Sequence, residues 1–178
     1  MSLFYATIAT GLFLILCGGT LIFNYNPSQK NLKAFPRSKP ATYILMATAI
    51  IWFSFKIYNL PSSEFGDYST ILLVIFLSIT FASFYLVPDF LGVRALAGLT
   101  LLIADILLDT AFMQEPTSRL FLVSFVYLAI LFVLILGVVP YVLRDVINWF
   151  FKIKFRVQIL ADALSFYGIL LTYVALNY

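Results

Sequence analysis

Three charged side chains recur along one long apolar segment, and their types and spacing can support chemistry. Arg94, Asp105 and Asp109 are separated by 11 and 4 residues. At about 100° per residue, all three fall within roughly one quarter of a helix circumference. At about 1.5 Å per residue, Asp105 lies about 16 Å and Asp109 about 22 Å beyond Arg94. A carboxylate near the bilayer centre costs about 2.5–3.5 kcal/mol on insertion scales, so this polar stripe should face the bundle interior, water or a partner.

Two interpretations of the stripe compete. In the first, Asp105 and Asp109 form a proton or cation relay across the membrane. In the second, the charges are ties between helices or between subunits. No recognised transport motif surrounds the two carboxylates, and their segment contains no proline. Both interpretations therefore stay open at the level of sequence.

Lys56 is the predicted ion-pair partner of Asp109. It lies about 15 residues into the second apolar segment, which runs in the same direction as the fourth, so the depths of Lys56 and Asp109 match. An ion pair would remove much of the cost of both charges, although a buried pair need not stabilise the protein overall. Asp162, about a turn and a half into the last segment, is expected within reach of Arg94 or Arg144.

A second candidate region combines aromatic and basic side chains between residues 144 and 156. We expect Trp149, Lys152, Lys154 and Arg156 to contact anionic lipid or a partner protein. The alternative is an aromatic belt with the positive charge of the inner membrane face. The basic stretch 30–39 can likewise dock a partner, but topology alone accounts for its charge.

Composition removes several classes of site. The chain has no histidine, so haem with an axial His, His-rich metal centres and imidazole catalysis are excluded. The single cysteine, Cys17, cannot form an internal disulfide and is expected to be a buried small hydrophobe. We found no zinc, phosphate-loop, acyl-transfer or phosphatase pattern. The sequence therefore predicts no cofactor and no enzyme.

The elements that carry these residues are predicted to be transmembrane helices. Hydrophobic residues make up 63% of the 178 residues and charged residues 11%, against about 45–50% and about 25% in soluble domains. A helix needs about 20 apolar residues to cross a bilayer. The expected spans, in one all-α membrane domain covering residues 1–178, are 3–23, 41–60, 68–87, 90–113, 119–143 and 157–178. Asp89 is expected to cap the fourth span.

Lysine and arginine positions predict the orientation of the six spans. The first span has no Lys or Arg before Lys30 and is read as a retained helix, without the basic region of a signal peptide. Basic residues concentrate on the inner side of membranes. Placing both termini outside puts nine of the eleven Lys and Arg residues inside, at Lys30, Lys33, Arg37, Lys39, Arg94, Arg144, Lys152, Lys154 and Arg156.

Two functions fit these observations. The first is a non-catalytic integral subunit or assembly factor of a larger membrane complex, which binds other membrane subunits or further copies of itself. The second is a small proton- or cation-coupled carrier that uses Asp105 and Asp109. Neither has a nucleic acid partner, because the basic residues flank apolar spans and form no extended polar face. We expect the prokaryotic cytoplasmic membrane as its location.

Overall fold

The computed structural model describes residues 2–61, 65–86 and 90–178. Six of its helices are long and apolar enough to cross a membrane. This confirms the predicted all-α fold, and the chain is an integral membrane protein that spans the bilayer several times. The predicted cap at Asp89 lies outside the described residues.

Shorter helical segments join several of the six spans. The spans are α1 (Leu3–Phe23), α3 (Lys39–Tyr58), α4 (Ser69–Leu86), α5 (Leu91–Ala111), α6 (Leu120–Val138) and α8 (Lys154–Ala175). Two ten-residue helices connect them, α2 (Tyr25–Ala34) and α7 (Tyr141–Phe150). Three 3-10 turns complete the described elements, η1 (Phe35–Arg37), η3 (Gly66–Tyr68) and η4 (Thr117–Arg119).

All of the spans except α6 begin and end within three residues of their predicted limits. Helix α6 differs for a local reason. That span was expected to continue to residue 143, but α6 ends at Val138. Pro140 follows and becomes the first flanking residue of α7. Proline has no N–H group for a helix hydrogen bond, so the apolar run 139–143 continues the hydrophobic pattern without continuing the helix.

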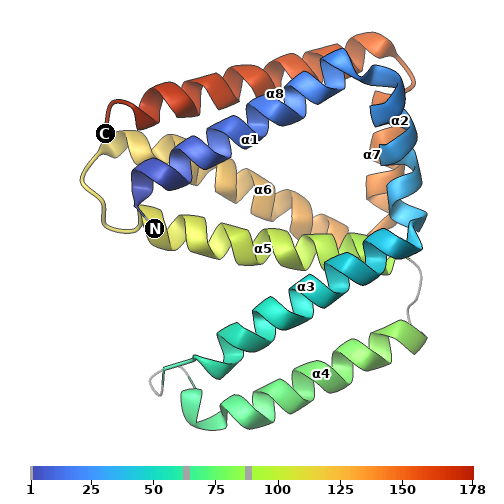
Figure 1. Cartoon of the computed structure of the whole chain (residues 1–178), viewed down its shortest axis with the longest axis vertical. Helices are drawn as coiled ribbons and strands as arrows, with labels where there is room; N and C mark the ends of the chain where they lie inside the picture. Colours follow the sequence, from blue (N-terminus) through green and yellow to red (C-terminus); the bar gives the residue numbers. More distant parts are fainter. Residues whose placement is uncertain (1, 62–64, 87–89) are drawn as a thin grey trace.

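The short helices α2 and α7 were not predicted as helices. Both lie across one end of the bundle, and they contact each other (Figure 1). Ile147 of α7 packs with Phe151 and Val157, while Arg144 and Asn148 remain exposed. Such a one-sided helix is typical of the membrane interface. The hydropathy signal used for spans misses it because ten residues are too few to cross a bilayer.

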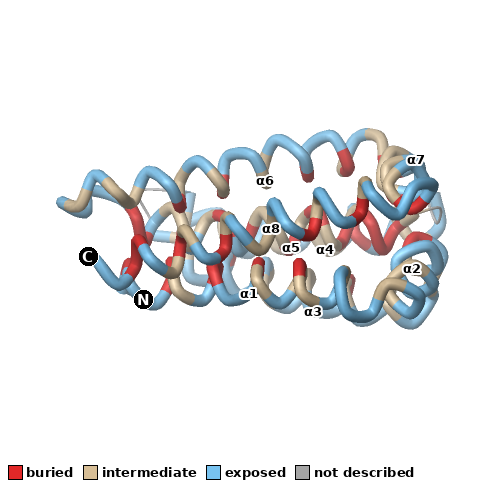
Figure 2. Tube along the Cα trace, turned by 90° about the horizontal axis from the view of Figure 1, so that it is seen from above, coloured by how far each residue is buried: buried red, intermediate tan, exposed pale blue. Residues whose placement is uncertain are grey.

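The main core joins α1, α5, α6 and α8. Its largest fully buried side chains include Leu122, Val126 and Leu171, and the buried positions face inward along these helices (Figure 2). Tyr167 of α8 also donates a hydrogen bond of 2.8 Å to the carbonyl oxygen of Phe121 at the start of α6. These contacts form one four-helix unit.

Helices α1 and α8 run antiparallel, and small residues let their backbones approach closely. A Cβ atom at Gly11 would lie 2.8 Å from the carbonyl oxygen of Gly168, and one at Gly18 would lie 2.6 Å from that of Ala161. Side chains larger than hydrogen have no room at either contact. Transmembrane interfaces often use small residues in this way, since hydrophobic burial gives little drive for association in lipid.

The α3–α4 hairpin attaches to this unit through α3 and α5. Met46 of α3 packs with Leu91 and Ala95 of α5. Helix α4 lies at the edge of the molecule beside α3 (Figure 1). Of its residues Ser69–Leu86, Thr80 alone is buried. The outer face of α4 is therefore left to lipid or to another protein.

The two ends of the bundle differ in charge. The basic residues on α2, η1 and α7 and at the starts of α3, α5 and α8 gather at one end, whereas both termini lie at the other (Figure 1). The separation of charge that the sequence predicts is thus present in the fold. Which end faces the cytoplasm remains a prediction.

Candidate functional site: an ion pair in an intramembrane groove

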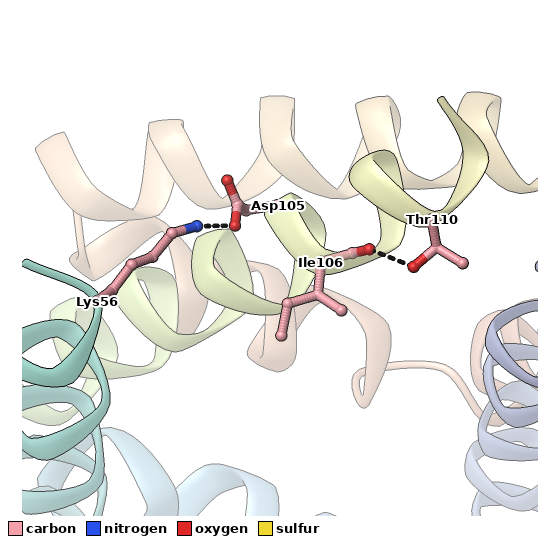
Figure 3. Close-up of polar contacts among 4 residues, drawn as sticks. All are labelled: Lys56, Asp105, Ile106 and Thr110. Atoms are coloured by element: carbon pink, nitrogen blue, oxygen red, sulfur yellow. Dashed lines mark hydrogen bonds and ion pairs between the residues drawn. The ribbon is translucent and has the colours of Figure 1, made fainter. Parts of the chain in front are cut away.

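The site begins with an ion pair between two spans. Lys56, in the last turn of α3, donates a hydrogen bond to a carboxylate oxygen of Asp105 on α5 (Figure 3). Asp105 is 14 residues into α5 from Leu91, which places it about 21 Å along the helix at about 1.5 Å per residue. The hydrocarbon core is about 30 Å thick. The pair therefore lies within the membrane, nearer to the end that carries the termini.

The prediction that Lys56 pairs with Asp109 is wrong by one helical turn, because Lys56 pairs with Asp105. The depth comparison correctly paired α3 with α5, which are neighbours running in the same direction. It treated side chains as if they projected level with their own Cα atoms. Helical side chains lean toward the N-terminus of their helix, and a long lysine side chain reaches further in that direction than a short aspartate does. Lys56 therefore reaches back toward the basic end and meets Asp105 instead.

Both members of the pair are half exposed. The side chains of Lys56 and Asp105 retain 44% and 43% of their accessible surface. They line a groove of about 480 Å³ whose other walls are apolar, contributed by Ala49 and Phe53 of α3, Phe76 of α4, and Gly98, Leu101 and Leu102 of α5. The exposed parts of both side chains thus face a groove on the side of the bundle, at the depth of the hydrocarbon core.

The remaining stripe residues do not join this groove. Asp109 is exposed in the last turn of α5, and Arg94 is half buried in the first turn. Asp162 is exposed on α8, which packs mainly against α1. Within the described ranges, the ion pairs are Lys56–Asp105 and Arg144–Asp145, so the expected contact of Asp162 with Arg94 or Arg144 is not made.

The aromatic and basic residues near α7 form a second cluster. The Arg156 guanidinium lies 4.1 Å from the centroid of the Trp149 ring and donates a hydrogen bond of 3.2 Å to the Trp149 carbonyl oxygen. The Lys154 ammonium lies 5.7 Å from the ring centroid of Tyr25 on α2. These cation–π contacts join the start of α8 to α7 and α2. Lys152 is exposed in the turn between them. Contact of this cluster with lipid or a partner stays a prediction.

Sequence reasoning missed the walls of the groove. Gly98 has open space where a Cβ atom would stand, with no atom of a neighbouring element within 4 Å. The sequence offers no signal for this, because Gly11 and Gly98 look alike in an apolar helix but one is tightly packed and the other open. Only the positions of neighbouring helices distinguish them.

No family model, curated protein or solved structure matches this chain.

Replacement of Lys56 and Asp105 should give coupled, non-additive losses of stability. Asp105→Asn leaves the lysine without its counter-charge, and Lys56→Met does the same to the carboxylate, so the double variant should recover part of either loss. A coupling free energy of about 0.5–3 kcal/mol is expected for residues in direct contact. Thermal unfolding in detergent measures it. Asp109→Asn combined with Lys56→Met is the control and should be additive; coupling there instead of at Asp105 would contradict the observed pairing.

Proposed function

We propose that this chain is a non-catalytic integral subunit or assembly factor of a larger membrane complex, in the prokaryotic cytoplasmic membrane. Its groove between α3, α4 and α5 receives a transmembrane helix of another protein. The observation that supports this proposal is the half-exposed Lys56–Asp105 pair at the depth of the hydrocarbon core.

Charge chemistry explains why a protein helix suits this groove. Charged side chains within membranes face a bundle interior or a water-filled cavity, because lipid cannot hydrogen-bond to them. The Lys56–Asp105 pair satisfies only part of that requirement, since almost half of each side chain remains exposed. A neighbouring helix with Ser, Thr, Asn or Gln side chains would hydrogen-bond to the exposed atoms and pack against the apolar walls.

The carrier interpretation has less support from the same geometry. A relay needs its two carboxylates along one path, but Asp105 lines the groove and Asp109 does not. Asp105 is also already paired with Lys56. A subunit or assembly role needs neither a continuous path nor a titrating carboxylate.

Crosslinking from inside the groove tests the proposal. A photoreactive phenylalanine analogue at Phe53, in the native membrane, should give a single adduct with a different protein. A Cβ atom at Gly98 meets no neighbouring element within 4 Å, so Gly98→Leu places a side chain in the groove and should reduce that adduct at least about tenfold, by excluding the partner helix. The control is Gly137→Leu on α6, where a Cβ atom also has open space within 4 Å; it should leave the adduct unchanged.

Three results would contradict this function. An adduct formed only between copies of this chain would show that the groove binds a second copy in a homo-oligomer and not a different protein. Labelling of lipid alone would show that the groove is a lipid-facing surface. An adduct unaffected by Gly98→Leu would show that the partner binds elsewhere.

A further inference from the structure

The basic end of the bundle contains two adjoining cavities lined by cations from separate elements. The larger, of about 620 Å³, is lined by Arg37 of η1, Lys39 of α3 and Arg144 of α7. The smaller, of about 250 Å³, shares Arg37 and Arg144 and adds Lys33 of α2. Because Pro36 lines both as well, the two cavities form one concave surface with four positive side chains.

The positive charge of this surface is largely uncompensated by the residues that the structure describes. Asp145 accepts from Arg144, with 2.9 Å between the guanidinium nitrogen and the carboxylate oxygen. Lys33, Arg37 and Lys39 take part in no ion pair within the described ranges. The helices α3 and α5 also begin at the larger cavity, which Lys39 and Leu91 line, and helix N-termini add partial positive charge. An anionic group is therefore the favoured occupant.

The wall of the larger cavity that faces α3 and α4 is aromatic. Tyr43 and Phe84 stack with ring centroids 6.4 Å apart and planes 11° apart, and Phe90 completes this wall. Tyr43 is 63% exposed on the flank of α3. A molecule in this cavity thus meets both cations and an aromatic surface that continues onto a membrane-spanning helix.

We propose that these cavities bind an anionic membrane phospholipid. Its phosphate lies among Arg37, Lys39 and Arg144, and its acyl chains follow Tyr43 and Phe84 into the bilayer. Guanidinium groups bind phosphate oxygens through paired, charge-assisted hydrogen bonds. Basic pockets between membrane helices recognise anionic lipid head groups in this way.

Topology alone does not explain this arrangement. The positive-inside rule asks only that Lys and Arg lie on one side of the membrane, and exposed Lys30 and Lys152 satisfy it without lining either cavity. Arg37, Lys39 and Arg144, by contrast, converge from three elements on a common space. The proposed lipid site shares no lining residue with the groove around Lys56, so each proposal can fail without the other.

Lipid retention in nanodiscs tests the proposal. The full chain is placed in phosphatidylcholine nanodiscs containing a minor fraction of phosphatidylglycerol, and the lipid that remains bound is identified by native mass spectrometry. We expect selective retention of phosphatidylglycerol. The double variant Arg37→Gln with Arg144→Gln should weaken it at least about tenfold, since two charge-assisted hydrogen-bond donors are lost.

A charge-matched control separates a binding site from general surface attraction. Lys30→Glu lowers the charge of the same end of the bundle by the same amount, at an exposed residue that lines neither cavity, and should change retention by less than about threefold. If the Arg variant unfolds, the pair Lys33→Gln with Lys39→Gln provides the same test. Thermal unfolding of each variant shows whether the fold is intact.

Each contrary result overturns the lipid site. Equal losses in the Arg37→Gln, Arg144→Gln double variant and in Lys30→Glu would mean that only surface charge attracts the lipid. Equal retention of phosphatidylcholine would remove the role of the anionic head group. Competition by soluble glycerol phosphate at concentrations comparable to the lipid would show that the aromatic wall and acyl chains contribute nothing, leaving only a site for free phosphate.

Discussion

Gly18→Leu is expected to force α1 away from α8 and to lower the stability of the protein markedly. A Cβ atom at Gly18 overlaps the Ser165 hydroxyl and lies 2.6 Å from the Ala161 carbonyl oxygen. The serine can rotate, but the carbonyl is part of the α8 backbone, so one of the two helices must move. Inserting side-chain atoms into a packed interface typically costs about 1–3 kcal/mol, occasionally more. Thermal unfolding in detergent measures this loss.

The adjacent glycine supplies the control. A Cβ atom at Gly19 meets nothing within 4 Å, so Gly19→Leu adds the same atoms one residue away, at a position whose Cβ has no contact with α8. Leucine also favours a helix more than glycine, by up to about 1 kcal/mol. Gly19→Leu should therefore be neutral or slightly stabilising. Equal destabilisation by both changes would contradict the close packing of α1 against α8.

Cysteine labelling should show an all-or-none difference between the two ends of the bundle. In a Cys17→Ala background, cysteine at Lys33 or Lys154 should react only with membrane-permeant maleimides, because the basic end is expected inside. Cysteine at Thr117 should react with impermeant reagents added to intact cells. A cysteine at Ser63, outside the described residues, is expected to behave like the one at Thr117.

Permeabilised cells provide the labelling control. There, impermeant reagent should reach Lys33→Cys, Lys154→Cys and Thr117→Cys alike, which shows that each thiol is accessible once the barrier is removed. The reverse pattern in intact cells would place both termini inside and would overturn the predicted orientation. It would leave the helix packing and the Lys56–Asp105 pair unchanged.

The proposed partner helix and the proposed lipid lie at opposite ends of α3. Lys39 begins this helix at the basic cavities, and Lys56 lies in its last turn at the groove. Because α3 also joins α4 to the remainder of the bundle, a lipid held at its start would help to fix the wall of the groove. The two binding tests use different residues and can be compared directly.

The sequence predicted the span that carries each candidate residue but not the contacts that the residue makes. Lys56 and Asp105 were assigned to two spans of like direction, and the structure shows that these spans are neighbours. The error in the predicted partner of Lys56 was a single helical turn. The segment 139–150 shows the same limit, since Pro140 ends α6 while apolar residues continue into α7. Hydropathy measures how favourable it is to transfer a side chain from water into lipid, and it does not show where a helix ends.

The sequence alone determined that this chain crosses a membrane through apolar helices and that its basic residues gather at one end, because both follow from the free energy of placing side chains in lipid or in water. Tertiary structure decided which of two similar aspartates meets Lys56, which glycines are packed and which are open, and how separate cations come to share a cavity. These features depend on helix crossing and side-chain direction, and local composition does not encode them. The apolar spans alone would permit many bundles, and the observed packing of α3, α4 and α5 is what places a half-exposed ion pair in a groove.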